Sequence, residues 1–347
     1  MKKQLNLDYE QRLQRKGIIF TIGTVLVLIV FGMIAMGLGR YSISVVEILA
    51  TVFPKLIPGI EVTDTMSTVI FNIRLPRVLL ACLAGSGLAV AGTAFQGIFS
   101  NALATPDTLG VASGAAFGAA FGLLLGVNIF LVQLFALVFG IISMLIVLYV
   151  SRINGTSTLI MIILAGMVVG ALFQAMVSLV KYVADPQDTL PSITYWLMGS
   201  LSGTTYETLA MGAPFIIVGI VMIFIFRWKL NAMSLHEDEA KSLGVNVKFV
   251  RIVMIVASTM ITAAVVSMCG SIGWIGLLIP HISRMIFGNN NRYVVPASIG
   301  FGAIYMLIID TMARCMTEAE VPVSILTAVI GAPFFIILLR KTGGIKG

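Results

Sequence analysis

The stretch "PRVLLACLAGSGLAVAGTAFQGI" (residues 76–98) decides the fold class of this protein. It carries one charged residue, Arg77, at its beginning and continues as an apolar run. A run of about 20 apolar residues is the length at which a helix crosses a lipid bilayer. Because similar runs recur along the chain, we expect an all-α polytopic membrane protein.

The composition supports this fold class. Of 347 residues, 59% are hydrophobic and 11% are charged, whereas soluble domains contain about 25% charged residues. The runs are continuous and do not show the short alternating segments of a β-barrel. We predict about ten spans, of which the third and eighth are short, at 18–38, 76–98, 109–126, 128–150, 158–183, 207–227, 249–269, 272–288, 293–313 and 321–340.

The positive residues indicate how the chain is oriented. With both termini in the cytoplasm, 16 of the 22 Lys and Arg residues fall on the inner side and 6 on the outer side, as the positive-inside rule requires. This bias also explains the net charge of +7 without a nucleic-acid partner. We therefore predict a cytoplasmic segment at 1–17, one transmembrane domain at 18–341 and a cytoplasmic tail at 342–347. The three cysteines show no metal or redox spacing, so we expect no metal site.

Arg74 and Arg77 lie on the outer side, against the general bias. Proline suits the first turn of a helix, so we expect the span to begin at Pro76 and to leave both arginines at its rim. One interpretation is anchoring to lipid headgroups. The other is contact with acidic residues of an outer partner, since a guanidinium holds a carboxylate bidentately.

Glycines recur at every fourth position after the second span. Such spacing forms a smooth ridge on a helix, against which another helix packs closely. We therefore assign a packing role to Gly110, Gly114, Gly118, Gly122 and Gly126. The preceding stretch, 99–108, reads as a non-helical insertion that must be packed within protein.

The longest polar stretch on the inner side is "LHEDEAKSLGVNVKFVR" (residues 235–251). We predict a short helix over His236–Leu243, ended by Gly244, with three acidic residues in its first turn. The alternatives are a solvated loop and a docking element for a cytoplasmic partner. In the later span at 270–288, Pro280 predicts a kink, and His281 and Arg284 share one helical face.

Few ionisable or amide side chains are predicted at membrane depth. Gln96, Gln174 and Asp310 are expected to face a cavity or each other. Asp310 precedes Arg314 by four residues, so the two can pair, which argues against a proton relay. The sequence also lacks a phosphate-binding loop. If ATP drives the protein, another subunit binds it.

Four stretches together resemble the FecCD family, the membrane permeases of ABC importers for iron-siderophores, haem and vitamin B12. They are residues 74–115, "EAKSLGV" (239–245), "GSIGWIGLLIPHISR" (270–284) and "VPVSILTAVIGAPFFIILLRK" (321–341). The chain departs from the family at Ala102, where proline is frequent, and at Ser324, where glycine is frequent.

The resemblance implies a type II ABC importer permease in a bacterial cytoplasmic membrane. It further implies a second permease, identical or paralogous, two cytoplasmic ATPases that hold ATP and Mg²⁺, and an extracytoplasmic binding lipoprotein or periplasmic protein. The chain itself is then no enzyme and binds no cofactor. We expect a ferric siderophore as cargo, with haem or cobalamin as alternatives. An ion-coupled secondary transporter is the competing class, and a channel is disfavoured because no filter motif is present.

The family's functional positions map onto this chain by its motifs. The resemblance assigns binding-protein docking to Arg74, Arg77 and Arg314. The ATPase coupling helix falls on about 235–244, with His236, Glu237, Asp238, Glu239, Ala240, Leu243 and Gly244. The pathway falls on the fifth span, with Gln174 as a polar residue and Thr156, Ser157 and Thr158 near a gate.

Overall fold

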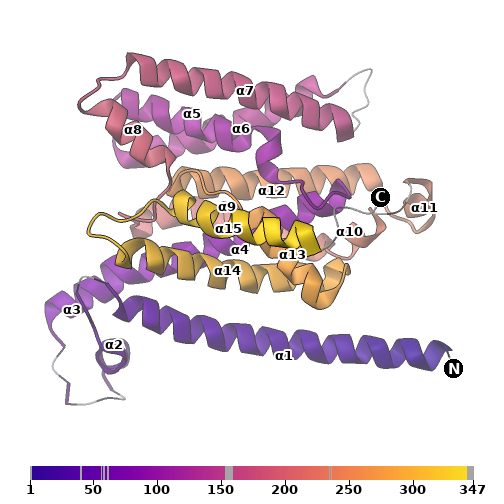
Figure 1. Ribbon diagram of the computed structural model, residues 1–347, viewed down its shortest axis with the longest axis horizontal. Helices are drawn as coiled ribbons and strands as arrows, with labels where there is room; N and C mark the ends of the chain where they lie inside the picture. Colours follow the sequence, from indigo (N-terminus) through magenta and orange to yellow (C-terminus); the bar gives the residue numbers. More distant parts are fainter. Residues whose placement is uncertain are drawn as a thin grey trace.

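The computed structural model describes residues 2–39, 41–55, 57, 59–60, 62–152, 159–233, 235 and 237–341. The described part of the chain is helical and contains no strand. Most helices run along one axis, so the bundle has two ends (Figure 1). We call them the α2 end, after α2 (Val45–Val52), and the α11 end, after α11 (Glu237–Ser242).

Ten helices correspond to the ten predicted spans. They are α1 (Lys2–Gly37), α4 (Leu75–Ile98), α5 (Val111–Leu124), α6 (Ile129–Val150), α7 (Leu159–Val183), α9 (Tyr206–Phe226), α12 (Val247–Cys269), α13 (Ile275–Phe287), α14 (Asn291–Cys315) and α15 (Val323–Lys341). Seven of the described helices are long and apolar enough to cross a membrane, and α5, α13 and the apolar part of α15 are shorter. The predicted fold class is therefore confirmed.

The centre of the bundle is formed by α4 and α12. Of their most apolar windows, 83% and 78% of the residues are buried, against 17% in α1 and 28% in α9. Small residues allow this close packing. A Cβ atom added to Gly92 of α4 would lie 1.9 Å from the Gly276 carbonyl oxygen, and one added to Gly85 would lie 2.1 Å from that of Gly302.

The glycine repeat serves two different purposes. A Cβ added to Gly114 would lie 2.6 Å from Ser143 Cβ, and one added to Gly118 would lie 2.3 Å from the Phe135 carbonyl oxygen. One added to Gly122 would lie 3.1 Å from Val132 Cα. These three glycines pack against α6 as predicted. Gly110 and Gly126 instead have φ values of +68° and +64°. They lie at the two ends of α5, where glycine adopts the left-handed conformation without steric cost. Gly110 also packs closely, but against α7, because a Cβ there would lie 2.8 Å from the Gly170 N atom. The ridge that faces α6 is therefore three glycines long.

The second span begins earlier than predicted. The helix is continuous from Asp64 to Ile98 and comprises α3 (Asp64–Thr68), a π-helical segment (Val69–Arg74) and α4. The prediction that it begins at Pro76 is wrong. A proline inside a helix removes one hydrogen bond and clashes with the carbonyl four residues earlier. We attribute the continuity to the wider π turn, which ends at Arg74, two residues before the proline.

The segment after α4 is non-helical, as predicted, until a 3₁₀ turn at Pro106–Leu109. Two of its backbone N–H groups are bonded locally: the Asn101 N–H donates to the Gln96 carbonyl at the end of α4 at 3.3 Å. The Leu103 N–H donates to Asn101 Oδ1 at 2.9 Å. This local bonding lets the chain turn without leaving those backbone groups unsatisfied.

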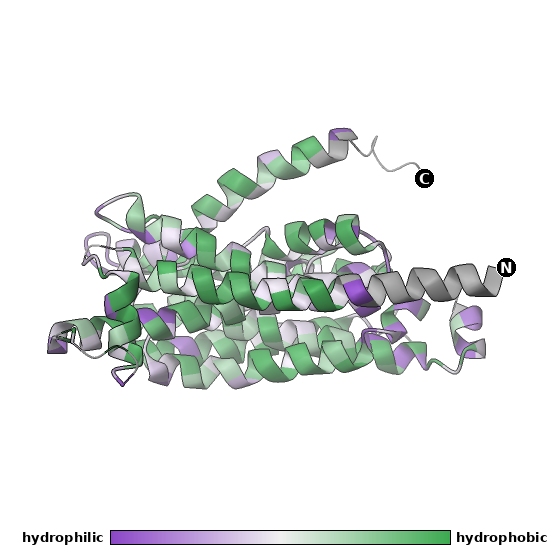
Figure 2. Ribbon diagram, turned by 90° about the horizontal axis from the view of Figure 1, so that it is seen from below, coloured by the Kyte–Doolittle hydropathy of each residue, from purple (hydrophilic) through white to green (hydrophobic). Residues whose placement is uncertain are grey.

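Two helices lie at the margins of the bundle, α7 at the top of Figure 1 and α15 in front. Figure 2 shows that α15 diverges from the other helices towards its C-terminal end. Val329 is 64% exposed on it, and Ile336 and Ile337 are 56% and 57% exposed. These apolar surfaces are available to lipid or to another membrane subunit.

Candidate functional site

A buried ionic cluster lies at the α2 end. Arg77 of α4 donates from Nε to Asp310 Oδ1 at 2.9 Å and from Nη1 to Glu320 Oε1 at 2.8 Å. The Arg77 and Asp310 side chains are 9% and 0% exposed, and that of Glu320 is 26% exposed. One guanidinium therefore joins α4 to α14 and to the loop that precedes α15.

Two further arginines hold the C-terminal end of α1. Arg74 donates to the carbonyls of Met36, Gly37 and Tyr41, and Arg314 donates to the Ala35 carbonyl. The last carbonyls of a helix lack partners within the helix and carry its negative dipole end, which favours such cations. Arg314 Nε also lies 3.7 Å from Asp310 Oδ2, so the predicted pairing of Asp310 with Arg314 is confirmed.

The burial of these arginines bears on their predicted role. We expected Arg74 and Arg77 at an exposed rim, but they are 5% and 7% exposed. Their guanidinium groups are occupied by carboxylates and carbonyls of the same chain. Direct contact of Arg74, Arg77 or Arg314 with a partner stays a prediction. In this conformation the bundle itself supplies their partners.

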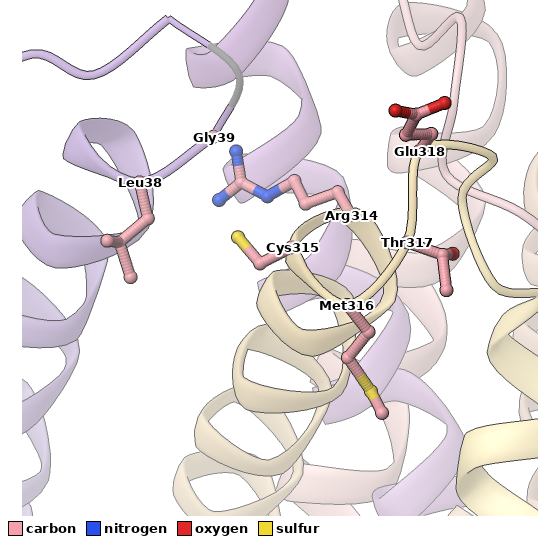
Figure 3. A pocket seen from close by; sticks show the side chains of 7 residues that line it. All are labelled: Leu38, Gly39, Arg314, Cys315, Met316, Thr317 and Glu318. Atoms are coloured by element: carbon pink, nitrogen blue, oxygen red, sulfur yellow. The ribbon is translucent and has the colours of Figure 1, made fainter.

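An open cavity of about 790 Å³ lies beside this cluster and is lined by Leu38, Gly39 and residues 314–318. Figure 3 shows the Arg314 guanidinium pointing towards Gly39, while the Glu318 carboxylate lies on the opposite side of the hollow. Met316, which lines the same hollow, is 58% exposed. The cavity gives the α2 end a concave surface with an exposed apolar and an exposed acidic residue.

The nearby helix α2 is fixed by its own cap. The Ser44 N–H and Oγ each donate to Glu47 Oε2 at 2.7 Å, and the Glu47 N–H donates back to Ser44 Oγ at 3.2 Å. This reciprocal arrangement is a capping box. The bonds from Ser44 hold the pKa of the Glu47 carboxyl below its usual value.

The fifth span, α7, presents polar residues on its exposed side. Ala171, Gln174 and Ser178 are exposed and share one helical face. Gln174 Nε2 donates to Ser113 Oγ of α5 at 3.2 Å. An exposed amide at membrane depth usually faces a cavity or another protein surface, and the pathway role of Gln174 stays a prediction. The predicted gate residues Thr156, Ser157 and Thr158 lie outside the described residues.

The predicted docking helix is present at the α11 end. It spans Glu237–Ser242, and Gly244 has a φ of +76°, so glycine ends the helix as predicted. Ala240 is fully buried, while Leu243 is 64% exposed. Asp238 and Glu239 are exposed as well. His236 and the side chain of Glu237 lie outside the described part of the structure.

Two predicted polar residues meet deeper in the bundle. Arg284 of α13 donates to Gln96 Oε1, and Gln96 Nε2 donates to the Gly276 carbonyl at 3.3 Å. Gln96 therefore links α4 to α13 at two points. The expectation that Gln96 faces another polar group is confirmed, and Arg284 and His281 lie on one helix as predicted.

Sequence reasoning missed Glu320 as the second partner of Arg77. The two residues are 243 positions apart, so no helical spacing joins them. The sequence did offer one signal. Glu320 directly precedes the last predicted span and lies on the outer side, where Arg77 was also predicted to lie. Within the described ranges, no group of three or more His, Cys, Asp or Glu residues is arranged to hold a metal ion.

Comparison with known proteins gives a consistent result. The model of the FecCD transport family matches residues 27–341. The molybdate import system permease protein of Haemophilus influenzae is 41% identical over 92% of this chain and 94% of its own. A probable iron chelatin transport system permease protein of Helicobacter pylori is 36% identical over 82% of this chain and 86% of its own.

A solved structure shares the fold. It shows a metal-chelate type ABC transporter in an inward-facing conformation, with a TM-score of 0.83 and 39% sequence identity. The match covers 92% of this chain and 98% of that chain. The likeness therefore extends over most of the bundle described above.

Proposed function

The chain belongs to the FecCD transport family of ABC importer permeases, and from that premise we propose that its cargo is an iron chelate. The chelate is delivered by an extracytoplasmic binding protein and released into the cytoplasm of a bacterium. ATP and Mg²⁺ are bound by separate ATPase subunits. Both termini of the permease face the cytoplasm, in keeping with its charge bias.

The observation that carries this mechanism is the geometry of α11. The helix is attached to the bundle by the buried Ala240, and Val245 directly after it is 4% exposed. Its other side presents Leu243, Asp238 and Glu239 to a partner. A short helix held on one side and exposed on the other can transmit a movement of the ATPases to the spans that flank it.

Transport requires two states of the permease. ATP binding to the ATPases favours one state of the permease, and hydrolysis restores the other. The reason is that the ATP-bound and ATP-free ATPases each bind one permease conformation more tightly. The exposed face of α7, with Gln174 and Ser178, lines the pathway opposite a second permease subunit. The chain supplies contacts that differ between the states and performs no covalent chemistry.

The binding protein docks at the α2 end. The concave surface beside Arg314 and the exposed Glu318 are accessible there. In place of direct contacts by Arg74, Arg77 and Arg314, we propose a positioning role. These arginines fix the end of α1 and the loop before α15, because their hydrogen bonds go to those segments. The docking surface is then held in one shape.

A second cargo is favoured by one observation. The relative from Haemophilus influenzae, 41% identical over nearly the whole chain, is named for molybdate. Relatives named for molybdate, iron chelatin, cobalamin and hemin are 41%, 36%, 35% and 34% identical to this chain, so identity alone does not select the cargo. We therefore keep molybdate as the second candidate, ahead of haem and cobalamin.

Uptake into vesicles tests the proposal. The permease is reconstituted with its ATPase and binding protein, and radiolabelled ferric siderophore, ferric citrate, molybdate, haem and cobalamin are offered in turn. We expect ATP-dependent uptake of an iron chelate. Uptake of molybdate and of no other compound would show that molybdate is the cargo. Uptake by the permease alone, driven by a proton or sodium gradient, would contradict the importer mechanism.

A further inference from the structure

A cavity of about 420 Å³ lies at the α11 end, and its described lining includes no residue of α11 or of α7. One wall is formed by Gly17–Ile22 of α1, and the others come from the end of α9, the end of α13 and the beginning of α14. Phe20 anchors α1 there, with its ring centroid 5.0 Å from that of Phe287 and 4.8 Å from that of Phe301. Figure 1 shows α1 and α14 side by side along this margin.

Two guanidinium groups line the cavity, Arg227 and Arg292, and no acidic residue is among the described lining. Arg227 lies over the Phe224 ring at 3.8 Å and donates from Nη1 to the Phe224 carbonyl at 2.6 Å. Its Nε is buried without a hydrogen-bond partner in the described structure. A buried donor of this kind requires an explanation, and two like charges in one cavity repel unless an anion joins them.

The remaining lining is apolar and leads to the membrane-facing side of α1. Ile18 and Ile22 line the cavity and are 62% and 56% exposed. A soluble anion such as phosphate would leave this apolar wall unused. An amphiphile would use both parts, with its acidic group between the arginines and its chains along α1.

We propose that this cavity binds one anionic glycerophospholipid, whose phosphodiester group is held by Arg227 and Arg292 and whose acyl chains lie along Ile18 and Ile22. A phosphate is a good acceptor for the planar fork of arginine. Basic pockets between transmembrane helices recognise anionic headgroups in this way. The site lies outside the proposed transport function and does not depend on the cargo. Its location suits a lipid that joins α1 to the bundle, because only 17% of the most apolar window of α1 is buried.

Native mass spectrometry of the full chain, purified in a non-ionic detergent, tests the site. Phosphatidylglycerol and phosphatidylcholine are titrated separately onto the delipidated protein. We expect one phosphatidylglycerol to bind about tenfold more tightly than phosphatidylcholine. Arg227→Gln and Arg292→Gln should each abolish this preference, and Arg292→Lys should retain part of it, because lysine keeps the charge without the fork.

Arg152→Gln is the matched control, since Arg152 is an exposed arginine after α6, outside the cavity lining. It should bind phosphatidylglycerol like the unchanged chain. All variants must elute as monodisperse protein, and Arg292→Gln is the most informative because its side chain is exposed. Equal lipid preference in Arg292→Gln and the unchanged chain would overturn the proposal. So would displacement of phosphatidylglycerol by millimolar inorganic phosphate, which would identify a site for a soluble anion.

Discussion

The arginines at the two ends of the bundle have different kinds of partner. At the α2 end, Arg77 pairs with two carboxylates of its own chain, and Arg74 and Arg314 bond to carbonyls of α1 and the chain just after it. At the α11 end, Arg284 donates to an amide oxygen and Arg227 to a backbone carbonyl. The acidic Asp238 and Glu239 point outwards there, on α11.

This difference shows at which end the chain pairs its buried charges with its own groups. A buried charge is costly unless it is paired, and each of the three arginines at the α2 end has a partner in the chain, although Arg314 Nε has only the ion pair with Asp310 and no hydrogen bond in the described structure. Exposed charges and an exposed Leu243 at the α11 end cost little in the isolated chain and remain available. We therefore expect mutations at the α2 end to change stability, and those at the α11 end to change partner-dependent activity.

The largest effect is expected for Asp310→Asn. The substitution leaves Arg77 and Arg314 buried beside a neutral amide, and breaking a buried ion pair costs about 3–5 kcal/mol. The thermal unfolding midpoint of the detergent-purified protein measures the loss. Glu318→Gln, on the exposed loop that follows α14, is the control and should leave the midpoint unchanged. A small shift for Asp310→Asn would show that the cluster does not stabilise the α2 end.

The next prediction concerns ATPase coupling at the α11 end. Leu243→Arg should reduce transport-coupled ATPase activity by about tenfold, or about 1.4 kcal/mol of coupling, because it alters the exposed side of α11. An exposed substitution changes stability by about 0.5 kcal/mol or less, so the unfolding midpoint should not move. ATPase activity of the reconstituted complex is the measurement, with Arg152→Gln as the control. Unchanged coupling would remove α11 from the mechanism.

Arg74→Gln should have an intermediate effect on stability. It removes charge-assisted bonds to the end of α1, for a net loss of about 1.5–3 kcal/mol, while leaving the Arg77 cluster intact. Hydrogen exchange should increase near Met36–Gly37, and the unfolding midpoint should fall less than in Asp310→Asn. If exchange rises only in distant helices, the arginine does not hold α1.

The smallest effect is expected for Arg314→Lys on binding-protein docking. Lysine keeps the charge, and the buried position makes direct contact unnecessary, so affinity should change by no more than about twofold. The dissociation constant is measured at low and high salt, because exposed charge contacts are screened. A tenfold loss without a change in unfolding midpoint would restore the direct docking role that the resemblance implies.

Much of the fold could be predicted because apolar run length determines a span almost by itself. The polar helix at 237–242 was also foreseeable, since acidic residues and Gly244 mark its two ends. The continuity through Pro76 was not, because a π turn has no clear sequence signal and proline usually marks a boundary. The partners of Arg74 are backbone carbonyls, and Glu320 reaches Arg77 only after the chain has folded. Neither contact leaves a periodic pattern.

The uninterrupted helix from Asp64 to Ile98 has a mechanical consequence. Its 35 residues correspond to about 52 Å at 1.5 Å per residue, whereas the hydrocarbon core of a bilayer is about 30 Å thick. The rod therefore extends well beyond the lipid. Its first residues project from the bundle, with Asp64, Thr65 and Thr68 exposed, and Arg77 ties the rod to α14 thirteen residues further on.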